Sequence, residues 1–399
     1  MTLAGRSLLL LLAAAPFVLG SQALGLMVQM GIAVILCLSF WLLMGQGGMV
    51  SFGHAVYSGL GAFALIHLLR VLPAGLQIPW GVVPASLLIA LLPLVGGLAA
   101  ALVAWPLGWL ATRHDSGTAF AMITLGLGEL FWAAAQMLPS VFGGEAGITA
   151  DRSTGPLAGF SWGPLRHLYL LMLVYVLLSV WLLRAYTASP AGSLLRAVRD
   201  KPQRVSFLGQ DPRRIRHISF VVAGFFAGVA GALAALFNEI VSAEVLSSQR
   251  SAAVLVFTLM GGLGHWSGPV LGGLLMVLFT VVLSGWTQAW LLYMGLAFVA
   301  VLLWLPAGLA SGLGQWQRVM RQRPWVSGLQ VLSLLLAVAG LCAALEMAYQ
   351  LRLADTVGAR VVFLALSLDA HAAEHWWIAV AMVLTGLAAL RWLARRGLR

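Results

Sequence analysis

The run FVVAGFFAGVAGALAAL, from Phe220 to Leu236, carries no charged side chain. Extended by a few residues at its ends, an apolar helix of this kind matches the ~30 Å thickness of a hydrocarbon core. Similar apolar runs of about twenty residues recur from one end of the chain to the other. The stretch therefore predicts a membrane-spanning helix, and its repetition predicts a chain that crosses the membrane many times.

The composition of the whole chain agrees with this interpretation. The 399 residues are 61% hydrophobic and 9% charged, and the mean hydropathy is +0.97. A soluble domain is apolar over only about half of its residues, and a β-barrel would show alternating segments of ~10 residues. Cys37 and Cys342 fall inside predicted spans and are interpreted as small buried apolar residues. The predicted fold class is an all-α polytopic membrane protein without a disulfide framework.

We expect about ten core transmembrane helices and a C-terminal extension of two more. The first domain covers residues 1–310, and a transmembrane hairpin covers residues 311–399. Segment 54–72 is either a full span or a broken, re-entrant one. The predicted spans are 7–23, 25–44, 54–72, 82–111, 118–138, 168–186, 217–238, 246–263, 268–286, 288–305, 325–345 and 376–394.

The distribution of basic residues sets the expected orientation. With the N-terminus inside, 17 of the 23 Lys and Arg residues fall on the inner side and the remaining six on the outer side. Inner loops of membrane proteins carry such an excess. Both termini are therefore expected in the cytoplasm.

The densest basic stretch, residues 187–216, lies on the inner side. Ser189 suits a helix N-cap, Pro190 the first helical position, Pro202 a break and Gly209 a stop. These signals predict an amphipathic helical hairpin that docks a cytoplasmic partner or anionic lipid; a plain topology signal is the alternative. The residues assigned to docking are Ser189, Pro190, Gly192, Leu194, Leu195, Arg196, Val198, Arg199, Asp200, Arg204, Leu208 and Gly209.

Several features inside the spans indicate packing or a path for a solute. The glycine-rich stretch 45–61 predicts an interrupted helix, where transporters often bind substrate. Glu129 lies well inside a span, where an acid marks a pathway or pairs with a neighbour such as Gln136. Gly224, Gly228 and Gly231 share one helical face and are expected to pack against a neighbouring helix of the same chain. The candidate pathway residues are Gln46, Gly48, Ser51, Gly53, His54, Glu129, Gly143, Gly144 and Gly147, although His54 could equally be a packed histidine.

Four ordered motifs, over roughly residues 25–310, resemble the M-type permease subunit of ABC importers for branched-chain amino acids. They are GQGGMVSFGHAVYSGLGAF from Gly45, TLGLGELFWAAAQMLPSVFGGEAGI from Thr124, SPAGSLLRAVRD from Ser189 with Leu208-Gly209, and LMGGLGHWSGPVLGG from Leu259. Met49 stands where that family commonly has glutamine, and Glu145-Ala146 where it commonly has Pro-Asn. These departures leave the solute open among branched-chain amino acids, urea, short amides and aromatic acids.

The resemblance implies a set of partners. It implies a second homologous permease, two cytoplasmic ATPases that hold ATP and Mg, and a periplasmic binding protein, in a bacterial cytoplasmic membrane. The basic hairpin would receive the ATPase motion. No cofactor is expected on this chain, because a Walker A loop needs Gly-Lys-Ser/Thr and the only lysine, Lys201, follows Asp200.

Two other function classes remain open at this stage. A self-contained secondary transporter or channel would need coupling groups, for which only Glu129 is a candidate. A membrane enzyme could use His371, Glu374 and His375 of the sequence HAAEH, which matches a zinc-peptidase spelling. Incidental polar residues at a membrane boundary explain HAAEH better, and no metal is expected there.

Overall fold

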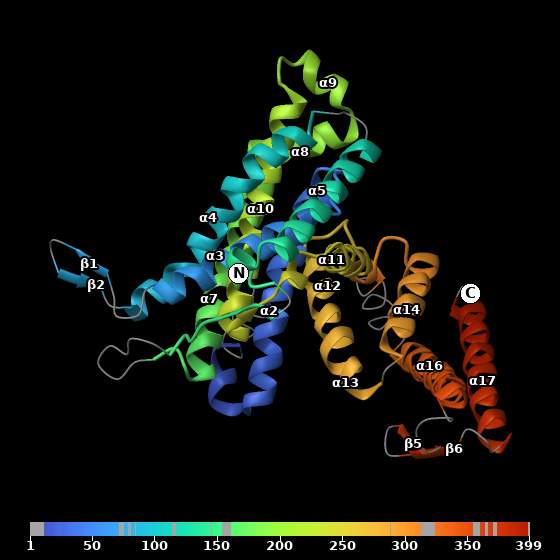
Figure 1. The fold of residues 1–399 in the computed structure, drawn as a ribbon. Helices are drawn as coiled ribbons and strands as arrows, with labels where there is room; N and C mark the ends of the chain where they lie inside the picture. The colour runs from blue at the N-terminus through green and yellow to red at the C-terminus, as the bar shows by residue number, and fades with distance from the viewer. Residues whose placement is uncertain are drawn as a thin grey trace. The chain divides into compact units, whose positions relative to one another are not determined.

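The computed structural model forms two compact units (Figure 1). Unit 1 comprises Met1–Leu283 and Phe298–Ala310, and unit 2 comprises Ser284–Ala297 and Ser311–Arg399. The structure describes residues 12–71, 76–78, 81–83, 85–113, 117–144, 146–153, 161–287, 289–312, 324–353, 360–363, 366–369 and 373–397.

The described part of unit 1 is built almost entirely of helices. A short helix over 12–18 precedes the first long one. The helices are α2 (Ser21–Trp41), η1 (Leu42–Gln46), α3 (His54–Val71), α4 (Ala85–Ala111), α5 (Gly117–Met137), α6 (Pro139–Phe142), α7 (Leu165–Ala188), α8 (Pro190–Asp200), α9 (Pro202–Phe207), α10 (Pro212–Asn238), η2 (Ala243–Leu246), α11 (Ser248–Gly261), α12 (Ser267–Val277) and η3 (Leu278–Leu283).

The strands of the described residues are short two-stranded ladders in the connections. They form the antiparallel pairs β1 (Leu76–Ile78) with β2 (Gly81–Val83), β3 (Ile148–Thr149) with β4 (Ile240–Val241), and β5 (Arg360–Phe363) with β6 (Leu366–Asp369). Of these, the β3–β4 pair matters for function, because it ties two connections that are far apart in the sequence.

Seven helical stretches among the described residues are long and apolar enough to cross a membrane. They are Ser21–Gln46, His54–Val71, Leu87–Ala111, Gly117–Met137, Leu165–Ala188, Pro212–Asn238 and Ser267–Trp286. The all-α polytopic membrane fold is therefore confirmed, and His54–Val71 is a continuous helix rather than a broken one. The predicted span 246–263 is wrong as a full crossing, since the 14 residues of α11 reach only ~21 Å at 1.5 Å per residue.

The core of unit 1 forms where α10 packs against α3 and α4. A Cβ on Gly231 would overlap the carbonyl oxygen of Ser58 in α3, and one on Gly228 would meet the Cβ of Ala100 in α4. Gly224 faces Ala104 of α4. The small face of α10 is thus used for packing within the chain, because only small side chains let two helix backbones approach so closely.

Unit 2 is a second helical body, with α13 (Ser284–Trp286), the part of α14 (Trp290–Trp304) up to Ala297, α16 (Pro324–Leu353) and α17 (Ala373–Gly397). Gly340 of α16 approaches the backbone of Ala379 in α17, so these two helices form a close pair. Glu346 lies within α16 and is buried. Its Oε1 atom accepts a hydrogen bond from the Tyr293 hydroxyl at 3.1 Å.

Candidate functional site

The break in the glycine-rich stretch lies just before α3. Helix α2 continues into the π-helical turn η1, and Gly48 adopts a φ of +67°, a conformation that favours glycine. Residues 49–51 have no regular structure, and α3 begins at His54. The predicted interruption is therefore present, over residues 47–53.

The basic hairpin docks directly on this break. Arg196 donates from Nη1 to Oε1 of Gln46 at 3.0 Å and to the carbonyl oxygen of Thr187 at 2.8 Å. Arg199 donates from Nη1 to the carbonyl oxygen of Gly45 and from Nε to Oδ1 of Asp200. A Cβ on Gly48 would lie 2.8 Å from Cγ of Arg199. These contacts join the hairpin and the interrupted helix into one junction, which we call the hairpin–break junction (Gly45, Gln46, Gly48, Arg196 and Arg199).

The local signals for the hairpin are confirmed. The Ser189 side chain caps α8 by accepting from the amide of Gly192, and Pro190 is its first residue. Lys201 separates α8 from α9, which starts at Pro202. Figure 1 shows α8 and α9 at one end of α10.

The apolar face of α8 packs within this chain instead of binding a partner. Leu195 and Val198 are completely buried within this chain, and Gly47 lies against Leu195. Leu194 is only partly exposed. The expectation that these three side chains insert into a partner is wrong for Leu195 and Val198, because the chain itself covers them.

The exposed apolar residues of the hairpin are at the end of α9. Phe207 and Leu208 are 88% and 76% exposed, whereas Val205 is buried. Arg204 and Gly209 are also exposed. Leu208 was a predicted docking residue, but Phe207 was missed; its signal in the sequence is a large aromatic side chain beside the helix stop. We call Phe207 and Leu208 the hairpin tip.

Ser51, Gly53 and His54 meet α2 and α5 rather than the hairpin. His54 is buried, and its Nε2 atom lies 2.8 Å from Oγ of Ser39. Within the described part of the chain, Oγ of Ser51 and Nδ1 of His54 are buried without a hydrogen-bond partner. A Cβ on Gly53 would overlap the carbonyl oxygen of Thr124 in α5. His54 is thus a packed histidine whose own Nδ1 atom lacks a hydrogen-bond partner among the described residues.

Glu129 does not have the internal partner that was expected. It lies at the thirteenth of the 21 positions of α5, near the middle of this apolar helix, and its side chain is exposed. Gln136 is exposed on the same face. Pairing of these two residues with other helices of this chain is therefore absent from the part that the structure describes.

The glycines at the end of the second motif, which begins at Thr124, form a tight turn near β4. Gly143, Gly144 and Gly147 have φ values of +74°, +59° and +72°. The turn leads into β3, whose Ile148 pairs with Val241 of β4. Glu145, one of the departures from the family pattern, lies outside the described residues, as does His371 of HAAEH. The candidate pathway residues are therefore distributed over four places: the hairpin–break junction, the start of α3, the exposed face of α5 with Glu129, and this turn.

Comparison with known proteins identifies the family. Residues 22–307 match the family described as branched-chain amino acid transport system / permease component. The chain is 26% identical over 325 residues to the LivM high-affinity branched-chain amino acid permease proteins of Escherichia coli and Salmonella typhimurium, covering 76% of this chain and 73% of each relative. It is 24% identical over 250 residues to a probable LivH permease protein of Methanocaldococcus jannaschii, covering 62% of this chain and 76% of the relative. No solved structure matches. The match covers most of the chain, and the protein belongs to the family of branched-chain amino acid transport system permease components.

Proposed function

We propose that the chain is a membrane-spanning permease subunit of an ATP-driven ABC importer, which moves branched-chain or related amino acids inward across a bacterial cytoplasmic membrane. Family membership supports the solute class. The position of the hairpin carries the proposed coupling. Its tip is exposed, and its Arg196 and Arg199 side chains contact the interrupted helix. A force on Phe207 and Leu208 would reach Gln46 and Gly45 through the hydrogen bonds of Arg196 and Arg199.

The proposed partners are a second homologous permease, two cytoplasmic ATPases that bind ATP and Mg, and an external solute-binding protein. Separate ATPases are needed because Lys201 lies between α8 and α9 and not in a phosphate-binding loop. The excess of Arg and Lys on the hairpin side supports a cytoplasmic hairpin and cytoplasmic termini.

Reconstitution of the complete complex tests this function. In proteoliposomes with its ATPases and a leucine-loaded binding protein, the complex should accumulate radiolabelled leucine only when ATP and Mg are supplied. The purified chain alone should hydrolyse no ATP. Leucine uptake by the chain alone, driven by an ion gradient, would instead establish a secondary transporter.

One exposed face of α5 is suited to contact the second permease. Met122, Gly126, Glu129, Ala133 and Gln136 recur at intervals of three and four residues and are all exposed. A carboxylate in the middle of an apolar span is costly against lipid, by ~2.5 kcal/mol or more. We therefore assign this face to the second permease.

Replacing Glu129 by alanine should lower ATP-driven uptake about tenfold or more, because the carboxylate then loses its contacts inside the assembled transporter. The measurement is leucine uptake at matched expression, together with recovery of the assembled complex. Glu374→Ala is the control, since Glu374 is also exposed but begins α17 in unit 2. Equal uptake by both variants would show that Glu129 merely faces water.

A further inference from the structure

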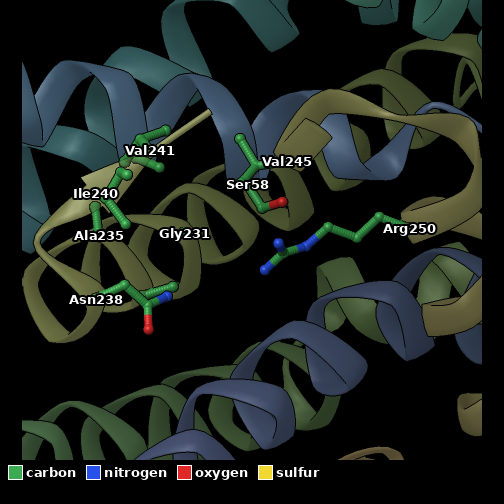
Figure 2. A pocket seen from close by; sticks show the side chains of 10 residues that line it. Ser58, Gly231, Ala235, Asn238, Ile240, Val241, Val245 and Arg250 are labelled. Atoms are coloured by element: carbon green, nitrogen blue, oxygen red, sulfur yellow. The ribbon is translucent and has the colours of Figure 1, made fainter. Parts of the chain in front are cut away.

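A small cavity lies between α3, the last turns of α10 and the segment that leads into α11 (Figure 2). Its walls include Ala62 of α3, Ala235 of α10, Val241 of β4 and Val245 of η2. One cation, Arg250, lines it, and Figure 2 shows the guanidinium pointing into the space toward Ser58. The cavity is therefore aliphatic on most sides, with one fixed positive charge.

Arg250 has an unusual environment. It lies in the first turn of α11, and its Nε atom is buried without a hydrogen-bond partner among the described residues. Glu244, which attracts it electrostatically, is exposed, and no ion pair joins the two. Arg250 as a whole is only partly exposed. A guanidinium does not deprotonate in proteins, so a partly buried one gains from an anionic partner that offsets its lost hydration.

The neighbouring residues hold Arg250 in place. Ser251, the next residue, is buried and accepts a hydrogen bond from the amide of Ala55 in α3 at 2.9 Å. Ser58 donates its hydroxyl hydrogen to the carbonyl oxygen of Ala55 at 2.9 Å, so its oxygen remains an acceptor. The cation and this acceptor thus come from two helices that are fixed to each other.

The cavity also lies between the separated groups of candidate pathway residues. Ser58 is one helical turn beyond His54 on α3. On the other side, Val241 pairs with Ile148 of β3, directly after the Gly143–Gly147 turn. Asn238, at the end of α10, lines the cavity and is exposed. A solute that enters near Asn238 would meet Arg250 before it reaches His54 and the break.

We propose that Arg250 binds the carboxylate group of the transported amino acid, and that the aliphatic wall receives its side chain. This inference rests on the proposed function. Carboxylate is the group that a guanidinium binds best, through two parallel hydrogen bonds, and Ser58 offers an acceptor to the solute's ammonium group. The cavity volume of about 20 Å³ holds only a water-sized group. Full occupation therefore requires the β4–η2 segment to move away from α3.

The test measures binding of radiolabelled leucine to the assembled, detergent-solubilised complex without the binding protein. Arg250→Gln should weaken leucine binding roughly 10- to 100-fold, as expected for loss of a hydrogen-bonded charge, and Arg250→Lys should fall between. Arg166→Gln is the control, because Arg166 is an exposed arginine at the start of α7. Against wild type, 4-methylvalerate, which keeps the carboxylate, should compete better than leucinamide, which lacks it. In Arg250→Gln this preference should disappear.

Other outcomes overturn the inference in distinguishable ways. An Arg250→Gln complex with normal leucine affinity and normal preference would show that Arg250 binds no solute. Poor assembly of Arg250→Gln, with normal leucine binding by the fraction that does assemble, would place the missing carboxylate on another subunit. If the wild-type complex bound and moved no amino acid at all, the proposed function itself would fail.

Discussion

Replacing Phe207 and Leu208 together by aspartate should release the ATPases from the complex and abolish ATP-driven uptake, while the membrane fold stays intact. Both side chains are largely exposed in this chain, so their loss removes no internal packing. Buried apolar anchors dominate protein interfaces, and truncating each typically costs about 2 kcal/mol or more, or about 30-fold in affinity. The measurement is co-purification of the ATPases with the permease, followed by uptake in proteoliposomes.

Two further variants make this experiment specific. Gln210→Asp adds one negative charge at an exposed position two residues beyond the tip but removes no apolar anchor, so the complex should survive. Leu195→Asp buries a charge inside the chain's own hairpin packing, so it should lower the yield of folded permease itself. Coupled ATPases retained by the Phe207 and Leu208 double variant would show that the tip is not the docking surface.

Local signals in the sequence predict where the helices of the hairpin begin and end, but not which surface covers them. The N-cap at Ser189, the break at Pro202 and the stop at Gly209 are local signals, and the structure confirms them. The amphipathic pattern also predicted correctly that Leu195 and Val198 would be buried. The pattern could not predict which residues cover these two side chains. The surface that covers α8 includes Gly47, about 150 residues away in the sequence.

For charged residues inside the membrane, the sequence predicts the span in which they lie but not the direction of their side chains. Hydropathy placed Glu129 correctly within a span, but the direction of a side chain depends on how the helix packs. Thr124 and Gly128 turn one face of α5 toward Phe52 and Gly53, which leaves Glu129 on the opposite face. Arg250 falls at the start of the predicted span 246–263. Its position in the cavity results from the short helix α11 and the contact of Ser251 with α3, neither of which hydropathy can predict.

Replacing Gly231 by alanine should remove most of the folded permease from the membrane, even though only one methyl group is added. The new Cβ would overlap the carbonyl oxygen and carbonyl carbon of Ser58, which are backbone atoms and cannot rotate away. Helices α3 and α10 would have to separate, and overpacking of this kind typically costs 1–3 kcal/mol or more. That is a large fraction of the ~5–15 kcal/mol that stabilises a typical protein. The measurement is the yield of monodisperse protein after detergent extraction, with its thermal unfolding midpoint.

The matched control is Gly126→Ala in α5, and both variants are measured on the isolated chain because Gly126 lies on the face assigned to the second permease. A Cβ at Gly126 would meet no other atom within 4 Å, so the substitution should be neutral or raise helix stability by up to ~1 kcal/mol. The two variants make the same chemical change inside two apolar membrane helices, and they differ in what the added methyl group meets. Equal yield and equal unfolding midpoints for both would mean that α3 and α10 do not approach as closely as the structure shows. The cavity that holds Arg250 would then have a different wall, because Gly231 and Ser58 both line it.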